Sequence, residues 1–288
     1  MRETATSATD SRAPSIRHVR RRSALISLAL CCASTCALAT PPVPLVAPPA
    51  SSIPAGPLGA AINLGQSIVV NSQRFAKAYV GNGLNCASCH LDAGRTPYAA
   101  PLVGLTGVFP EYRSRRGGVE SLEQRINDCF VRSMNGRALP TGSAEMIGVL
   151  AYIAWLSQGV PVGTEVIGRG FRELAPPAQR PDQARGKTLY VQKCAVCHGA
   201  TGQGLVGAAN AFVFPPLWGA RSFNTGAGMA RVSIAAAFVQ AKMPLGNAGT
   251  LTDQEAHDIA AYFTAQPRPR FAGAAGDWPK GERPADAR

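Results

Sequence analysis

The stretch "NCASCH", residues 85–90, carries the pattern Cys-x-x-Cys-His, and "KCAVCH", residues 193–198, repeats it 108 residues later. This pattern is the attachment signature of a c-type haem, in which two thiols add to the porphyrin vinyl groups and the histidine binds iron. A zinc site needs no histidine directly after each cysteine pair, and a thioredoxin-like pair normally sits in a βαβ unit that this sequence does not predict. We therefore expect two covalently bound haem c groups, attached through Cys86, Cys89, Cys194 and Cys197 with His90 and His198 on the irons.

The sequence around the two motifs also repeats. "PLVG" at 101–104 corresponds to "PLWG" at 216–219, and "GVLAYIAWL" at 148–156 corresponds to "HDIAAYFTA" at 257–265. We predict that each proline carbonyl of the two "PL" pairs accepts the free imidazole N–H of its motif histidine, while each leucine packs on the porphyrin.

The repeat predicts the fold class. Thr252 and Glu255 form a capping box ahead of the last helix, and no run of alternating strands is present. The corresponding helix near residues 147–154 is apolar nearly all round, so we expect it to lie buried between the domains. We predict an all-α protein with two tandem class I cytochrome c-like domains, at 58–160 and 178–268, joined by a linker at 161–177 and followed by a tail at 269–288.

The N-terminus predicts export. Four arginines in residues 17–22 precede an apolar run that ends in "CALAT", which is typical of a signal peptide cleaved near Ala39. Residues 40–57 are rich in proline and should form an extended, mobile linker. We therefore expect a periplasmic protein without a membrane-spanning segment in its mature form.

The charge after cleavage narrows the class of partner. Loss of six arginines and two acidic residues from totals of 29 and 17 leaves 23 basic and 15 acidic residues, a net charge of +8. This balance favours anionic small molecules or acidic proteins as partners. No stripe of basic and aromatic residues indicates nucleic-acid binding.

Spacing along the chain suggests which side chain lies opposite each motif histidine. Met243 follows His198 by 45 residues and is succeeded by a proline that ends the helix, while Lys242 lies close enough to compete for iron. In the first domain Met134 follows His90 by 44 residues and has the corresponding spacing.

Helical spacing instead draws attention to Cys129. It aligns Arg125, Cys129 and Ser133 at positions i, i+4 and i+8, so that thiol, hydroxyl and guanidinium share a face. Six arginines gather within 25 residues of chain, which suits recognition of an oxyanion. They are Arg113, Arg115, Arg116, Arg125, Arg132 and Arg137.

From about Tyr79 to its end the chain resembles the thiosulfate dehydrogenase family of dihaem cytochromes c. The resemblance is carried by the run from "YVGNGLNCASCH" to "EQRINDC", and by "WLSQGVPVG", "FPPLWG", "MARV" and "MPLG". It implies oxidation of two thiosulfate ions to tetrathionate, with two electrons passed to a small periplasmic acceptor such as a cytochrome c or a high-potential iron–sulfur protein. Some members of the family run better in reverse.

The same resemblance assigns roles to residues. It implies that Cys129, not Met134, binds iron opposite His90, and that Arg115, Arg125 and Ser133 form the substrate pocket. It implies His198 and Met243 as ligands of the second haem, with Lys242 as an alternative ligand in one redox state. Cys129 would then hold a sulfur atom of the substrate transiently. Two other readings stay open: a dihaem electron carrier without substrate chemistry, and a SoxA-like sulfur-oxidation subunit.

Overall fold

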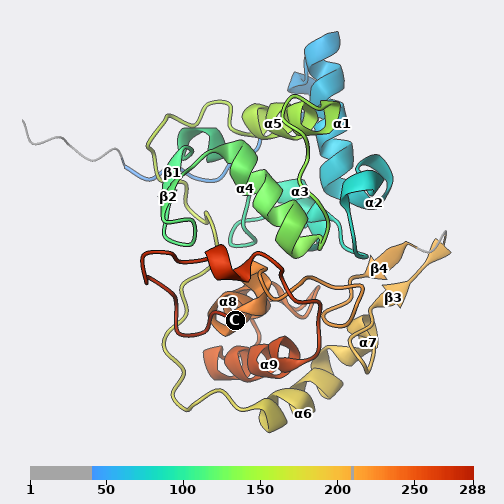
Figure 1. Cartoon of the computed structure of the whole chain (residues 1–288), viewed down its shortest axis with the longest axis vertical. Coiled ribbons are helices and arrows are strands. Elements are labelled where there is room, and N and C mark those ends of the chain that lie inside the picture. The colour runs from blue at the N-terminus through green and yellow to red at the C-terminus, as the bar shows by residue number, and fades with distance from the viewer. Residues whose placement is uncertain (1–40, 209–210) are drawn as a thin grey trace, which may run out of the picture. The chain divides into compact units, whose positions relative to one another are not determined.

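The computed structural model of the chain describes residues 41–208 and 211–288. The signal peptide expected at 1–39 lies outside this range. Two groups of helices follow one another along the chain (Figure 1). The first group is α1 (Pro57–Val70), α2 (Ser72–Phe75), α3 (Leu91–Gly94), α4 (Leu122–Asp128) and α5 (Ala144–Leu156). The second group is α6 (Gln183–Lys193), α7 (Ala195–His198), α8 (Val232–Lys242) and α9 (Asp253–Ala265).

In each group the first and last long helices cross at a glycine. A Cβ atom on Gly65 of α1 would lie 1.9 Å from the carbonyl oxygen of Gly148 in α5. A Cβ atom on Gly186 of α6 would lie 1.9 Å from the carbonyl oxygen of Asp258 in α9. Only glycine permits so close an approach of the two backbones, and the two domains share this arrangement.

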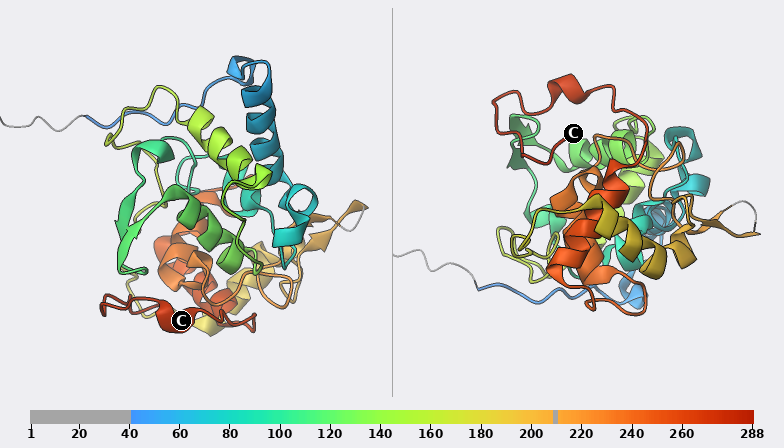
Figure 2. Two further views of the ribbon diagram at one scale, coloured as in Figure 1. Left: turned by 45° about the horizontal axis from the view of Figure 1, so that its top comes forward. Right: turned by 90° about the horizontal axis from the view of Figure 1, so that it is seen from below.

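Two helix predictions have different outcomes. The Thr252 hydroxyl accepts from the Glu255 N–H at 3.2 Å, and the Glu255 carboxylate accepts from the Thr252 N–H at 2.9 Å, so the capping box is confirmed. The expectation that α5 lies between the domains is wrong, because its apolar surface packs on α1 within the first domain (Figure 2, left).

Two short antiparallel hairpins accompany the helices. β1 (Glu111–Arg113) pairs with β2 (Gly118–Glu120), and β3 (Leu205–Val206) pairs with β4 (Phe212–Phe214). The sequence analysis did not predict them, because strands of two or three residues are too short to show an alternating pattern. The fold class stays all-α, with the hairpins as additions to it.

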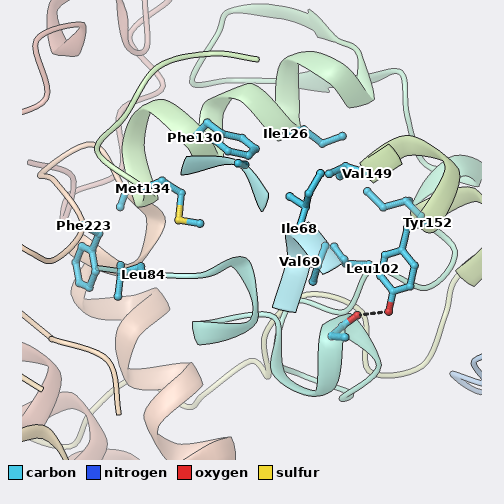
Figure 3. Packing of buried hydrophobic residues seen from close by; sticks show 14 of the residues in the cluster. Ile68, Val69, Leu84, Leu102, Ile126, Phe130, Met134, Val149, Tyr152 and Phe223 are labelled. Carbon is cyan, nitrogen blue, oxygen red and sulfur yellow. Dashed lines mark hydrogen bonds between the residues drawn. The ribbon is translucent and has the colours of Figure 1, made fainter. Parts of the chain in front are cut away.

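The described residues form one unit, and the two helix groups within it share a core. Figure 3 shows Leu84 and Met134 of the first domain beside Phe223 of the second. The Asn82 side-chain amide donates to the carbonyl oxygens of Ser133 and Ser222, at 2.8 and 3.0 Å. These two bonds tie the segment before the first haem motif to both domains.

The proline-rich segment is docked, contrary to our expectation that it is mobile. Its Val43 N–H donates to the Glu165 carbonyl at 2.9 Å, and its carbonyl accepts from the Ile167 N–H at 2.8 Å. Leu45 and Ala47 pack against the core, so the segment contributes apolar surface. Within the part of the chain that the structure describes, no helix is long and apolar enough to cross a bilayer.

Candidate functional site

Two cavities open beside the two Cys-x-x-Cys-His motifs. The first cavity, of about 530 Å³, is lined by Cys86 and His90, and the second cavity, of about 400 Å³, by Cys194, Cys197 and His198. At both motifs one backbone turn brings the histidine back toward the first cysteine. The histidine N–H donates to the carbonyl of that cysteine at 2.9 Å in each case.

The two imidazoles are oriented in the same way. His90 Nδ1 lies within hydrogen-bond distance of the Ala100 carbonyl, and His198 Nδ1 lies 2.9 Å from the Pro215 carbonyl. A carbonyl partner fixes the protonated nitrogen and leaves Nε2 to face the cavity. The prediction named Pro101 and Pro216, so it was wrong by one residue at both sites. The leucines that follow these prolines line their respective cavities, as expected.

Cys129 faces the first cavity from a widened helical turn. After α4 ends, the residues Cys129–Ser133 form a π-helical turn in which the Met134 N–H donates to the Cys129 carbonyl at 2.9 Å. Such a turn holds one more residue than an α-helical turn and is often found at functional sites. Both Cys129 and Ser133 line the first cavity, although the helix between them is not regular.

The Cys129 thiol lies beside His90 and Arg125. Burial raises its pKa, but the Arg125 guanidinium and the hydrogen bond with His90 outweigh burial, so the net effect lowers the pKa of Cys129. The thiol in turn raises the pKa of Arg125. The thiolate form, which is the nucleophile and the metal ligand, is therefore favoured at this position.

Met134 directly follows this turn and does not line the first cavity. Its side chain is only 2% exposed and packs in the shared core with Leu84 and Phe223 (Figure 3). Cys129 thus lines the first cavity, whereas Met134, which follows the π-helical turn, lies in the core. Spacing from the motif histidine could not reveal this, because it assumes that the two domains end their helices alike.

Five of the six clustered arginines line the first cavity. They are Arg113, Arg115, Arg116, Arg125 and Arg132. Arg137 lies elsewhere, where its Nε donates to the Ala78 carbonyl at 2.8 Å and its guanidinium covers Tyr79. Burial, followed by the charge of Arg132, lowers the pKa of Arg115 to about 10. A guanidinium with little water around it interacts more strongly with an anion.

Sequence reasoning missed Arg169, Arg231 and Trp278, which all line the first cavity. Arg231 comes from the N-terminal end of α8 in the second domain, and Trp278 comes from the C-terminal tail. Arg231 lies within the quoted "MARV" segment, but nothing local indicated that it would reach the other domain. For Trp278 the sequence gives a weak indication of burial, since it is a large aromatic residue in a polar tail.

The wall of the second cavity that follows α8 is apolar. Met243, Pro244 and Leu245 line it directly after the end of α8. Lys242, the last residue of that helix, is adjacent to this wall, and burial lowers its pKa. The structure thus brings Met243 to the same cavity as His198, with Lys242 next to it in the chain.

A single loop separates the two cavities. Cys89 borders the second cavity together with Ala87 and Ser88, while Cys86 borders the first. Burial raises the pKa of the Cys89 thiol to about 12, with further contributions from Cys129 and Cys86, so it also lies near the first cavity. Cys89 is thus part of the wall between the cavities, which places the two motif sites close together.

These residues fit two haem c groups. None of the five cysteines in the described residues forms a disulfide, so both thiol pairs are available for attachment. Arg268 covers Phe223 and donates to the Phe263 carbonyl, and both phenylalanines line the second cavity. In the described chain its buried Nε and Nη1 atoms have no hydrogen-bond partner. A buried cation of this kind fits a cofactor that carries carboxylates.

Comparisons with known proteins agree with this geometry. Residues 72–162 match the family model described as "SoxA/TsdA, cytochrome c domain", and residues 183–266 match "Cytochrome c". The thiosulfate dehydrogenase of Allochromatium vinosum is 46% identical over 82% of this chain and 89% of its own length. That of Psychrobacter arcticus is 45% identical over 84% of this chain and 73% of its own length.

A solved structure of thiosulfate dehydrogenase from Marichromatium purpuratum has a similar fold. It superposes with a TM-score of 0.77 and is 41% identical. The match covers 84% of this chain and 54% of the other, so this chain spans about half the length of that protein.

Proposed function

The chain belongs to the thiosulfate dehydrogenase family of cytochromes c, and from this membership and the first cavity we propose that it couples two thiosulfate ions into tetrathionate. Two electrons leave per tetrathionate formed, since two dianions with four charges become one dianion. The observation that carries the proposal is Cys129, which lines the first cavity beside His90 and together with the clustered arginines. An electron carrier needs no such charged cavity.

We assign the cofactor ligands as follows. Cys86 and Cys89 hold the first haem with His90 and Cys129 on its iron, and Cys194 and Cys197 hold the second with His198 and Met243. Lys242 is the alternative ligand to Met243 in one redox state. When bound, the two haems supply two one-electron centres that take up the electrons from one turnover.

The arginines counteract the repulsion between the substrates. Two dianions about 4 Å apart repel each other by about 4 kcal/mol even in water. Arg115 and Arg125 place positive charge at the cavity wall, and their planar donors suit sulfonate oxygens. The Ser133 hydroxyl, also at the wall, donates a further hydrogen bond to the bound ion.

Cys129 holds the first substrate while the second arrives. When it does not occupy the iron, its thiolate would form a sulfur–sulfur bond with the outer sulfur of one thiosulfate, and the two electrons released would pass to the two oxidised haems. The outer sulfur of a second thiosulfate then attacks the substrate sulfur of this adduct, which releases tetrathionate and restores the thiolate. No proton needs to move, so the chain must only keep Cys129 ionised, which Arg125 favours.

The second domain serves as the electron exit. Among the residues that the structure describes, those lining its cavity are mainly apolar, which is suited to electron transfer. The acceptor is a small periplasmic protein such as a cytochrome c or a high-potential iron–sulfur protein. Our domain limits remain 58–160 and 178–268, in a protein exported by the signal at residues 1–39.

Purified holoprotein with thiosulfate and an artificial electron acceptor tests the proposal. We expect acceptor reduction by the isolated chain, with one tetrathionate formed per two thiosulfate ions consumed. Intact haems that give no reaction with thiosulfate or tetrathionate would identify an electron carrier instead. Activity that appears only on addition of a partner chain and a carrier protein would identify a SoxA-like subunit.

A further inference from the structure

The C-terminal segment 271–288, here called the strap, is attached to the first cavity. It runs between α4 and α8, where the two domains meet (Figure 1). The backbone N–H of Trp278 donates to the Arg115 carbonyl at 2.8 Å, and the Tyr112 hydroxyl donates to the Glu282 carboxylate at 3.2 Å. Trp278 and Pro284 themselves line the cavity. The strap is therefore part of the cavity wall, although no haem motif lies in it.

Trp278 holds the side chain of Arg115. The Arg115 guanidinium lies 4.6 Å from the centre of the Trp278 ring, and its other contacts are the Gly226 carbonyl and Asp277, which lies 3.9 Å away. Trp278 is only 8% exposed and has φ of +54°, a conformation that is unfavourable for a bulky side chain. Its contacts in the cavity wall must offset this cost.

The strap also supplies carboxylates to the arginine cluster. Asp277 accepts two hydrogen bonds from Arg132, at 2.8 and 2.7 Å, and Asp286 accepts from Arg231 Nε at 2.9 Å. The charges of Arg125, Arg132 and Arg231 each lower the pKa of Arg115, so Arg115 is repelled by all three. The strap carboxylates offset two of these charges, which lets the cations stay together at the cavity.

We propose that the strap is a positioning element of the substrate site, in which Trp278 fixes the Arg115 guanidinium for binding a sulfur oxyanion. The inference rests on the proposed function, because it takes thiosulfate and tetrathionate as the anions. Asp277 and Asp286 hold the neighbouring arginines in place, so that Arg115 meets the substrate already oriented. Preorganisation of this kind improves affinity because less side-chain freedom is lost on binding.

Two substitutions of Trp278 distinguish the contribution of its aromatic face from that of its apolar volume. Trp278→Leu keeps an apolar side chain in the wall but removes the π face, whereas Trp278→Phe keeps a ring to stack on Arg115. Ala275→Ser is the control within the strap, because Ala275 is exposed and plays no part in the contacts described above. A chain that ends at Gly273 lacks residues 274–288 of the strap. It keeps Phe271, whose ring lies beside Arg132.

Binding is measured by calorimetry with tetrathionate and the fully oxidised holoprotein, which has no electrons to turn the ligand over. We expect Trp278→Leu to weaken binding about tenfold, in line with loss of a partly desolvated cation–π contact, and Trp278→Phe to recover most of it. The KM for thiosulfate should rise with the same pattern. The shortened chain should bind more weakly still, and Ala275→Ser should bind like the wild type.

Wild-type affinity in both Trp278→Leu and the shortened chain would overturn the inference, as would a Trp278→Phe variant as weak as Trp278→Leu. Haem content and absorption spectra show whether each variant is intact; if Trp278→Leu loses haem, the comparison rests on Trp278→Phe and the shortened chain. A wild type that neither binds tetrathionate nor oxidises thiosulfate contradicts the proposed function itself. An active wild type with unaffected variants contradicts the strap alone.

Discussion

The first and second cavities start from the same framework and differ in what surrounds it. Each has a Cys-x-x-Cys-His motif, an imidazole oriented by a carbonyl and a leucine at the wall. The first cavity adds arginines from three parts of the chain, whereas the second is lined mainly by apolar side chains. The shared framework is suited to holding a haem, and the added charge is what makes the first cavity a candidate site for substrate chemistry.

The cavities also differ in how the side chain opposite the histidine reaches its position. In the second domain α8 ends at Lys242, and Met243 follows in an extended conformation. In the first domain a π-helical turn brings Cys129 forward and sends Met134 into the core. The side chain that reaches the cavity is therefore a thiol in the first domain and a thioether in the second.

Replacing Cys129 in the first cavity by methionine, the residue type found in the second cavity, should have the largest effect on activity. We expect Cys129→Met to reduce thiosulfate oxidation about a thousandfold, equivalent to about 4 kcal/mol of barrier, because the nucleophile is lost. Turnover with an artificial acceptor measures this effect. The EPR spectrum of the oxidised protein should lose its thiolate-ligated low-spin signal. Met134→Leu is the matched control and should keep both activity and signal. Full turnover by Cys129→Met would refute the catalytic role of Cys129.

The outcome at Cys129 illustrates what sequence can and cannot predict. The fold class and the capped helix at Thr252 follow from local patterns, and these predictions are confirmed. The π-helical turn is not encoded by any residue type, so spacing alone favoured Met134. The docking of Trp278 depends on contacts with Arg115, more than 160 residues earlier, which no local pattern contains.

Removal of one arginine from the first cavity tests whether charge distinguishes it from the second. Arg125 lies beside Cys129 and favours the thiolate. We expect Arg125→Gln to lower kcat/KM for thiosulfate about a hundredfold, or about 2.7 kcal/mol, because both substrate binding and thiol ionisation suffer. Steady-state kinetics measure this. Arg137→Gln removes the same charge outside the cavity and should change kcat/KM little; equal losses in both variants would mean that only net charge matters.

A substitution in the second cavity should change the reduction potential of the second haem and not the affinity for substrate. In Met243→Leu we expect Lys242 to replace the thioether and the second haem potential to fall on the order of 0.1 V, a small part of the roughly 0.8 V that axial ligands span. Redox titration followed by absorbance measures the shift. Lys242→Ala should keep the wild-type potential while Met243 is bound. If Met243→Leu leaves the potential unchanged, Met243 is not the ligand.

The smallest effect concerns the helix crossings that the domains share. Asp258 of α9 stands where α5 has Gly148, and its carboxylate accepts from Arg185 Nε and the Asp182 N–H, each at 2.7 Å. Burial alone would raise the pKa of Asp258, but these donors outweigh it and lower the pKa. The stabilisation is therefore complete above the unfolded value of about 4 and is lost as pH falls through the lower folded value.

Asp258→Asn should accordingly destabilise the holoprotein by about 1–2 kcal/mol at pH 7, as expected for a charged hydrogen bond, and by progressively less below pH 4. Thermal unfolding followed by circular dichroism from pH 2 to 7 measures the difference. Glu173→Gln, a change of the same type at an exposed position, should alter stability little at any pH. A constant difference between wild type and Asp258→Asn across this range would mean that packing, not charge, fixes the second crossing. The two domains would then hold their terminal helices by the same means.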